Sequence, residues 1–158
     1  MELFMEYYFR KADINDLEFI TNIRIKVLKI ANKLEKNIDM SNVFSETLKY
    51  YSKYLNDNNN ITYLGFDNDK FIACGSICFF DIMPTYNNQS GKKAYIMNMY
   101  TDENYRRKGI GSKILDLMIK NAKEKGVEQI QLEATEMGKY LYKKYGFVDL
   151  LNEMELGK

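Results

Sequence analysis

The chain has 158 residues, of which 46% are hydrophobic and 28% charged, and these proportions are typical of a single folded domain over residues 1–158. Its 23 Lys and Arg residues nearly balance 22 Asp and Glu residues, so we expect no nucleic-acid partner. No apolar run approaches the roughly 20 residues that a membrane span needs, and the N-terminus lacks a signal-peptide pattern. We therefore expect no membrane partner and a cytoplasmic location.

The absence of histidine from the chain narrows its chemistry. Without histidine, neither a Ser-His-Asp triad nor a His-liganded zinc site can form. Cys74 and Cys78 lie in one predicted strand, where four residues of extended chain separate them by about 13 Å, too far for a disulfide. A metal site would need more ligands than this segment offers, so we expect no metal and interpret both cysteines as small buried residues.

Hydrophobic periodicity and turn signals predict ten or eleven elements along the chain. Asp13 or Asn15 is expected to cap the first helix and Ser41 to be the N-cap of the second. The order predicts an α+β fold with α/β/α layers, a mixed sheet carrying helices on its faces. The predicted elements are strand 4–11, helices from 14 and over 41–55, strands 61–66, 71–82 and 94–101, helix 110–125, strand 128–134, helix 137–145 and one or two closing strands over 147–156.

A basic, glycine-containing stretch, NYRRKGIGSKIL, joins the strand that ends at Thr101 to the helix that begins near Ile110. A helix N-terminus offers unpaired N–H donors and about half a positive charge, and glycine lets a phosphate approach the backbone. The stretch therefore indicates an anion site, best suited to a pyrophosphate, although a solvated basic loop is the simpler alternative. Its three cations and two glycines are Arg106, Arg107, Lys108, Gly109 and Gly111.

Two familiar phosphate motifs do not fit this stretch. The P-loop spacing G-x-x-x-x-G-K-[ST] is absent. A dinucleotide fingerprint would need a third glycine where Ile114 stands, and the loop after Thr101 is several residues too long. Glu133 only superficially mimics the acid that binds a ribose, so a nicotinamide cofactor is not expected.

The pattern Arg106-x-x-Gly109-x-Gly111, after a strand and at the start of a helix, resembles the acetyl-CoA signature of the GNAT N-acetyltransferase superfamily. The segment LYKKYGF at 141–147 resembles the family's late Tyr-x-x-x-Gly-Phe segment, and the element order over roughly 6–156 resembles its whole domain. The stretch PTYNNQSGKKAYIMNMYT is similar to an uncharacterised bacterial branch. The resemblance implies a mostly antiparallel sheet with one splayed parallel strand pair, and acetyl-CoA as co-substrate.

The resemblance also implies which residues bind the cofactor. Backbone amides from Arg107 to Ser112 would hold the CoA pyrophosphate, and the end of the preceding strand would pair with the pantetheine arm. The amide of Met99 would face the thioester oxygen. Many members carry Asn seven residues before the late tyrosine, where this chain has Thr135, so that contact to the pantetheine departs from the pattern. The implied set is Met99, Tyr100, Thr101, Arg106, Arg107, Lys108, Gly109, Ile110, Gly111, Ser112 and Thr135.

Acyl transfer to an amine needs a donor for the leaving thiolate and an acceptor for the amine's proton. Tyr142 matches the family tyrosine that often protonates the CoA sulfur, and a phenol pKa near 10 suits a thiol pKa near 8.5. A core tyrosine, one turn from Tyr145, is the alternative interpretation. Glu133 and Glu136 follow the 128–134 strand and could each relay a proton through water, although both could be ordinary surface acids.

The predicted function is an acetyl-CoA-dependent N-acetyltransferase acting directly on a primary amine of a small molecule or a protein. The alternative is a CoA-binding regulatory or interaction module without turnover, which could dispense with Tyr142. We expect the acceptor near the helices at 13–57 and the loop at 83–93, and a homodimer stays open. Four tyrosines there either line a pocket or simply pack: Tyr50, Tyr51, Tyr54 and Tyr86.

Overall fold

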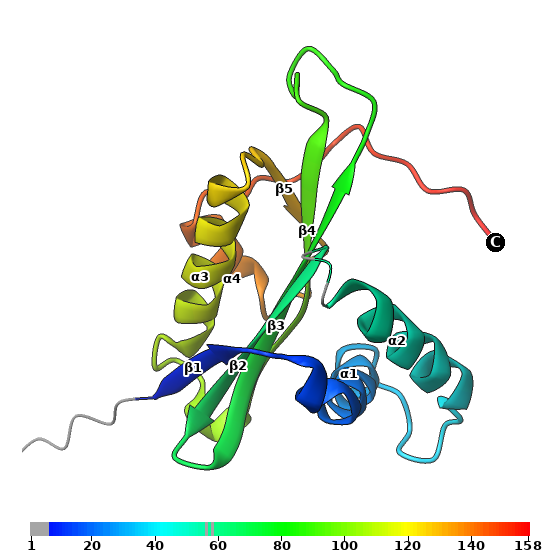
Figure 1. Cartoon of the computed structure of the whole chain (residues 1–158), viewed down its shortest axis with the longest axis vertical. Helices are drawn as coiled ribbons and strands as arrows, with labels where there is room; N and C mark the ends of the chain where they lie inside the picture. The colour runs from blue at the N-terminus through cyan, green and yellow to red at the C-terminus, as the bar shows by residue number, and fades with distance from the viewer. Residues whose placement is uncertain (1–6, 56, 58) are drawn as a thin grey trace, which may run out of the picture.

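The computed structural model describes residues 7–55, 57 and 59–158, and within them five strands form one sheet in the order β1-β2-β3-β4-β5 (Figure 1). The first four strands pair antiparallel with their neighbours, whereas β5 runs parallel to β4. This arrangement confirms the mixed, mostly antiparallel sheet. The strands are β1 (Tyr8–Lys11), β2 (Asn60–Asp67), β3 (Lys70–Asp81), β4 (Lys92–Thr101) and β5 (Gln129–Leu132).

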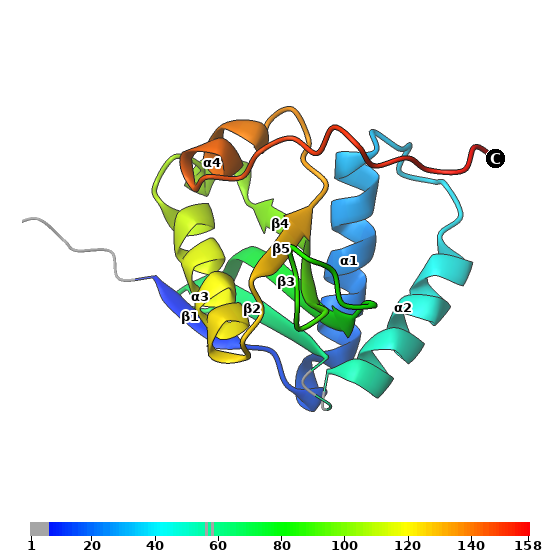
Figure 2. The same cartoon turned by 90° about the horizontal axis from the view of Figure 1, so that it is seen from above.

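Helices cover both faces of this sheet, which confirms the predicted α/β/α layers (Figure 2). One core cluster lies between the sheet and α3, and a second lies between the sheet and α1 with α2. No helix in the described part of the chain is both long and apolar enough to span a bilayer. The helices are η1 (Ile14–Asp16), α1 (Leu17–Ala31), α2 (Ser41–Tyr54), η2 (Glu103–Tyr105), α3 (Ile110–Glu124) and α4 (Lys139–Lys144).

The two predicted N-caps have different outcomes. The side chain of Asp13 accepts the amide of Asn15 at 2.8 Å, so the expected cap before the first helix is confirmed. Ser41 was wrongly expected as the N-cap of α2, because the helix is preceded by Met40 in that position. Asp39 takes the capping role instead, and its carboxylate accepts the Ser41 amide at 2.9 Å.

The ends of the chain differ from the sequence prediction. Residues 4–6 of the first predicted strand lie outside the described residues, and β1 begins at Tyr8. The closing strands predicted over 147–156 do not form: the segment after α4 pairs with no strand, although Glu153 accepts a hydrogen bond from the Gln131 side chain of β5 at 3.3 Å. An apolar pattern becomes a strand only where it finds an edge to pair with and a face to bury. Here several side chains stay exposed: Val148, Leu150, Leu151, Met154 and Leu156.

The parallel pair β4–β5 is short, and this opens the sheet. Paired residues run from Lys93 with Gln129 to Ile96 with Leu132. β5 ends there, while β4 continues to Thr101. The splayed pair is thereby confirmed, and the last part of β4 presents a backbone edge that β5 does not cover.

Candidate active site

A bulge deforms β4 just beyond the point where it leaves β5. Between the pairs Ser76–Met97 and Cys74–Tyr100, two residues of β4 oppose one residue of β3, which is a β-bulge. Its first residue, Asn98, has a left-handed φ of 58°. The bulge re-aims the open edge of β4, where the resemblance places the thioester.

Gly75 of β3 makes room for this bulge. A Cβ atom on Gly75 would lie 2.6 Å from Sδ of Met99 and 2.7 Å from Cγ2 of Ile114 in α3. The Met99 side chain therefore packs toward α3, whereas the ring of Tyr100 stacks on Phe71 on the α1 side, with centroids 6.1 Å apart. Because the side chains of Met99 and Tyr100 are packed against the two hydrophobic cores, any contact of these residues with a cofactor is made by their backbone.

The loop after β4 combines left-handed backbone with free amides. Arg107 and Gly109 have φ values of 59° and 78°. The first helical bond of α3 runs from the Lys113 amide to the Gly109 carbonyl at 3.0 Å, so the amides of residues 110–112 have no helical acceptor. These converging donors, with three exposed cations before them, fit a pyrophosphate.

The same loop is fastened at both of its sides. Nε of Arg106 donates to the Thr101 carbonyl at 3.2 Å, which holds the loop against the end of β4. The hydroxyl of Tyr105 donates to Asp67 at the end of β2 at 2.8 Å, and the Lys108 ammonium lies 5.1 Å from the Tyr105 ring centroid. Arg106 and Lys108 thus shape the loop as well as charging it.

Helix α4 packs directly on the start of α3. A Cβ atom on Gly111 would lie 3.3 Å from Cδ2 of Leu141, so a side chain there would press on α4. The neighbouring Tyr142 is buried in the core cluster that also contains Ile96, where β4 and β5 part, and Ile110, where α3 begins. A Cβ atom on Gly111 would also lie 4.0 Å from Oγ1 of Thr101, so the glycine loop lies between the end of β4 and α4, the helix that carries Tyr142.

The hydroxyl of Tyr142 has no hydrogen-bond partner among the described residues, and its phenol is protonated. Its ring lies edge-on to Phe147, with centroids 5.9 Å apart, and its hydroxyl makes no hydrogen bond to any residue of the described part of the chain. Burial raises the pKa of Tyr142, because the charged phenolate would be poorly solvated there. The hydroxyl is thus neutral at physiological pH and can serve as a proton donor.

Tyr145, one turn away, is engaged instead. Its hydroxyl lies 2.6 Å from Oδ1 of Asp116 and 3.0 Å from the carbonyl of Ser112, so it joins α4 to the first turns of α3. Burial and the hydrogen bond to Asp116 raise the pKa of Tyr145 to about 12. Tyr145 is therefore a structural clamp.

The two candidate acids occupy different surroundings. Glu136 is an exposed residue whose carboxylate accepts the Lys139 ammonium at 2.8 Å, and this hydrogen bond lowers its pKa. Glu133 follows β5 directly. Tyr95 of β4 pairs with Gln131 of β5, whose side chain donates to Glu153 at 3.3 Å, so these residues lie on one face. Burial raises the pKa of Tyr95, and the nearby charges of Glu133 and Glu153 raise it further. Glu133 lies at the splay, whereas Glu136, in the turn before α4, is held by Lys139.

Thr135 begins the turn into α4. Its hydroxyl accepts the Gly138 amide at 3.3 Å, and its carbonyl accepts the Lys139 amide at 3.1 Å. A Cβ atom on Gly138 would lie 2.9 Å from the Tyr142 ring. Sequence reasoning missed Gly138 and Gly75, although an isolated glycine inside a strand, as at Gly75, is a known sign of close backbone approach.

The remaining candidates do not form a second centre. Tyr51 is buried, and the Tyr50 hydroxyl donates to Cys78 at 3.1 Å, so these tyrosines pack, whereas Tyr86 is 91% exposed. Both cysteines are free, as expected, and Cys74 is buried, whereas Cys78 is only half-buried. Within the described residues, no group of three or more Cys, Asp or Glu side chains is placed to hold a metal ion.

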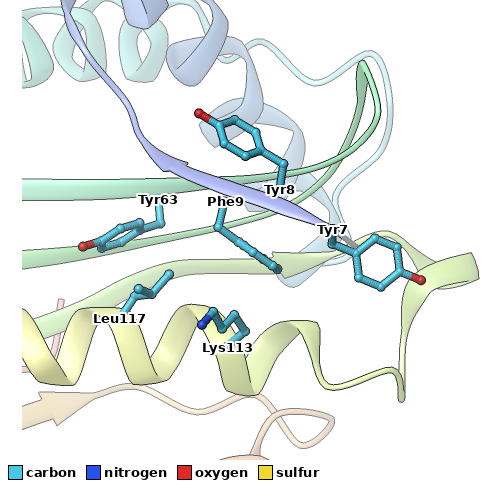
Figure 3. Close-up of a pocket in the computed structure, with 6 residues that line it drawn as sticks. All are labelled: Tyr7, Tyr8, Phe9, Tyr63, Lys113 and Leu117. Carbon is cyan, nitrogen blue, oxygen red and sulfur yellow. The ribbon is translucent and has the colours of Figure 1, made fainter. Parts of the chain in front are cut away.

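A groove of about 590 Å³ lies between β1 and α3 (Figure 3). In it Phe9 points toward Lys113 and Leu117 of α3, while Tyr8 points away from them. The groove is lined mostly by aromatic rings, with one cation, and lies away from the open edge of β4. We assign it no part in the chemistry.

Comparison with known proteins places this geometry in a family. The sequence model of the acetyltransferase (GNAT) family matches residues 29–147. A predicted acetyltransferase from Clostridium acetobutylicum, crystallised with acetyl-CoA, is 36% identical with a TM-score of 0.88, and the match covers 96% of both chains. A GCN5-related N-acetyltransferase from Ralstonia eutropha JMP134 shares the fold, with a TM-score of 0.83 at 22% identity, covering 97% of this chain and 99% of that chain.

Among curated proteins, the thialysine N-epsilon-acetyltransferase of Bos taurus is 35% identical over 69 residues. That match covers 42% of this chain and 41% of the bovine protein, so it spans less than half of either. The family match covers most of the chain and includes the glycine loop and Tyr142. The chain therefore belongs to the acetyltransferase (GNAT) family, and the acyltransferase assignment drawn from its signature is confirmed at the level of the family.

Proposed function

We propose that the protein transfers an acetyl group from acetyl-CoA directly to a primary amine. The observation that carries this proposal is the packing of α4 on the start of α3, where Leu141 meets Gly111. This contact sets α4, which carries the unengaged hydroxyl of Tyr142, beside the pyrophosphate-type cradle that follows β4. A binding module without turnover would need the cradle but not the hydroxyl.

Acetyl-CoA supplies the activated acyl group as a thioester. The amides of residues 110–112 bind its pyrophosphate, and the uncovered backbone of β4 near Met99 pairs with the extended pantetheine arm and polarises the thioester carbonyl. Each of these roles uses backbone groups, which is why the side chains of Met99 and Tyr100 are free to pack in opposite cores.

The chemical step forms one bond and breaks one. The neutral amine attacks the thioester carbon, the C–N bond forms, and the C–S bond breaks with the electron pair leaving on sulfur. Tyr142 donates its proton to the thiolate and recovers one from solvent. Glu133 accepts the proton lost by the amine through a water molecule, and it is better placed than Glu136, whose carboxylate is held by Lys139.

The acceptor class is supported by the face on which Glu133 lies. Acidic side chains beside β5, Glu133 and Glu153, favour a substrate that arrives with a positive charge. The bovine relative, named for acetylating the side-chain amine of thialysine, matches over part of its length and supports an amine at the end of a flexible chain.

A screen of primary amines with acetyl-CoA tests the proposal, with free CoA thiol followed over time. Polyamines, amino acids with side-chain amines, aminoglycosides and lysine-containing peptides cover the acceptor classes. We expect amine-dependent thiol release with at least one class. Acetyl-CoA binding without thiol release for any class would favour the regulatory module instead.

A further inference from the structure

Arg24 of α1 is a half-buried cation without an acidic partner. Its Nη1 donates one long hydrogen bond, 3.4 Å, to Oδ1 of Asn98. No carboxylate of a described residue lies within ion-pairing distance of it. By contrast, Arg10 pairs with Asp16 at 2.6 Å. A guanidinium carries five donors in a fixed fork, so most of the binding capacity of Arg24 is unused.

Arg24 lies next to the candidate active site, so its free N–H donors are within reach of a ligand there. Asn98 is the first residue of the β4 bulge, where β4 has just parted from β5. Arg24 approaches the bulge from α1, whereas the glycine loop begins α3 on the opposite face of the sheet (Figure 2). A ligand of Arg24 at the splay would therefore come from the side away from the pyrophosphate cradle, which is the side left for the acceptor.

We propose that Arg24 binds a carboxylate of the acceptor, so that the substrate class is an amino acid or a peptide end carrying a primary amine and a carboxylate. This inference rests on the proposed function. The neighbouring cation on α1, Lys26, lies 5.0 Å from the Tyr100 ring centroid and is engaged there. One free guanidinium balances one carboxylate charge and matches its two oxygens bidentately, whereas a phosphate dianion would call for more cations.

Negative charge, opposite in sign to Arg24, lies on the β5 side of the gap between β4 and β5. Tyr95 alternates with the core residues Ala94 and Ile96, so it faces the α1 side, and Glu133 and Glu153 lie near it. A substrate with separated positive and negative ends would meet acids beside β5 and the guanidinium beside α1. This charge pattern orients the acceptor and discriminates against plain diamines.

The test compares two matched acceptor pairs that differ by one carboxylate: lysine with 1,5-diaminopentane, and S-(2-aminoethyl)cysteine with bis(2-aminoethyl) sulfide. Initial rates of thiol release give KM and kcat, and calorimetry in the presence of CoA gives the affinity of each amine without turnover. The variants are Arg24→Gln, Arg24→Lys and, as a control of equal charge change on the same helix, Lys26→Gln.

We expect Arg24→Gln to raise KM or Kd of the carboxylate-bearing member at least tenfold, with kcat little changed. The decarboxylated member should bind equally well or better. Arg24→Lys should recover part of the affinity, and Lys26→Gln should behave like the wild type. Equal losses for both members of a pair, or equal effects of Arg24→Gln and Lys26→Gln, would overturn the inference.

Two further outcomes separate this inference from the proposed function. Acetylation of the diamines but not of their carboxylate-bearing partners would refute the role of Arg24 and leave the acetyltransferase intact. Failure of both carboxylate-bearing probes to bind the wild type at millimolar concentration would overturn the inference without reference to turnover. Binding of these probes without acetylation of any amine would instead count against the proposed function alone.

Discussion

At the scale of single residues, Tyr142 and Tyr145 lie one helical turn apart, and we propose that the first donates a proton while the second holds α4 to α3. Tyr142→Phe keeps the ring against Phe147 and removes only the hydroxyl. Because general-acid catalysis typically contributes about 10²–10⁴-fold, we expect kcat to fall by at least ~100-fold with little change in acetyl-CoA affinity. Steady-state kinetics together with cofactor titration measure both quantities.

Tyr145→Phe is the matched control for this substitution. It removes the hydrogen bonds to Asp116 and Ser112, so it should lower the free energy of unfolding by about 1 kcal/mol and leave most of kcat. A near-normal kcat in Tyr142→Phe would mean that water protonates the thiolate. A large loss of kcat in Tyr145→Phe alone would mean that Tyr145, one turn further along the helix, is the proton donor.

The raised pKa of Tyr142 makes a separate prediction on pH dependence. A general acid acts in its protonated form, and burial moves the pKa of this phenol above its usual value near 10. The wild-type kcat should therefore show no loss from deprotonation of Tyr142 between about pH 7 and 9.5. A basic limb with a midpoint near pH 8 that disappears in Tyr142→Phe would contradict this assignment.

At the scale of elements, the β4–α3 loop is tested by placing a carboxylate in the cradle. Gly111→Asp adds a negative charge beside the free amides and a Cβ atom 3.3 Å from Leu141. We expect acetyl-CoA affinity to fall at least tenfold, or about 1.4 kcal/mol. Gly157→Asp makes the same charge change where a Cβ atom meets nothing within 4 Å, and it should bind acetyl-CoA like the wild type. Equal affinities for the two folded variants would place the pyrophosphate elsewhere.

The same elements show what a sequence can predict. The helix start at Ile110 and its end before Gly126, with a left-handed φ of 72°, follow from local signals and are confirmed. The bulge at Asn98 and the free guanidinium of Arg24 depend on strand register and on a helix that packs from 74 residues away. Such long-range contacts leave little trace in local sequence patterns.

The closing strands failed for a related reason. Residues 147–156 carry a strand-like apolar pattern, but pairing is a property of two segments, and β5 is only four residues long. In the candidate site, the sequence motifs pointed to the glycine loop and to Tyr142. They did not show that Glu136 is paired with Lys139, which is what distinguishes it from Glu133. Motifs predict backbone cradles better than they predict the partners of surface acids.

At the scale of the whole molecule, acetyl-CoA should stabilise the fold. The cofactor would join β4, α3 and α4, which otherwise meet through the core cluster and the Tyr145 clamp. A ligand that binds only the native state stabilises it by mass action, by about 2.7 kcal/mol at a concentration of 100 Kd. We expect the melting temperature to rise with acetyl-CoA concentration and to rise less in Gly111→Asp. An unchanged melting temperature at millimolar acetyl-CoA would refute binding.

The central claim is direct transfer of the acetyl group at the open edge of β4. The most direct measurement follows free CoA thiol and acetylated amine together in one reaction, by a thiol reagent and by mass spectrometry, with the best acceptor from the screen. The account predicts equal amounts of the two products and negligible thiol release without amine. Thiol release that does not depend on amine, or that yields no acetylated amine, would contradict it by showing hydrolysis in place of transfer.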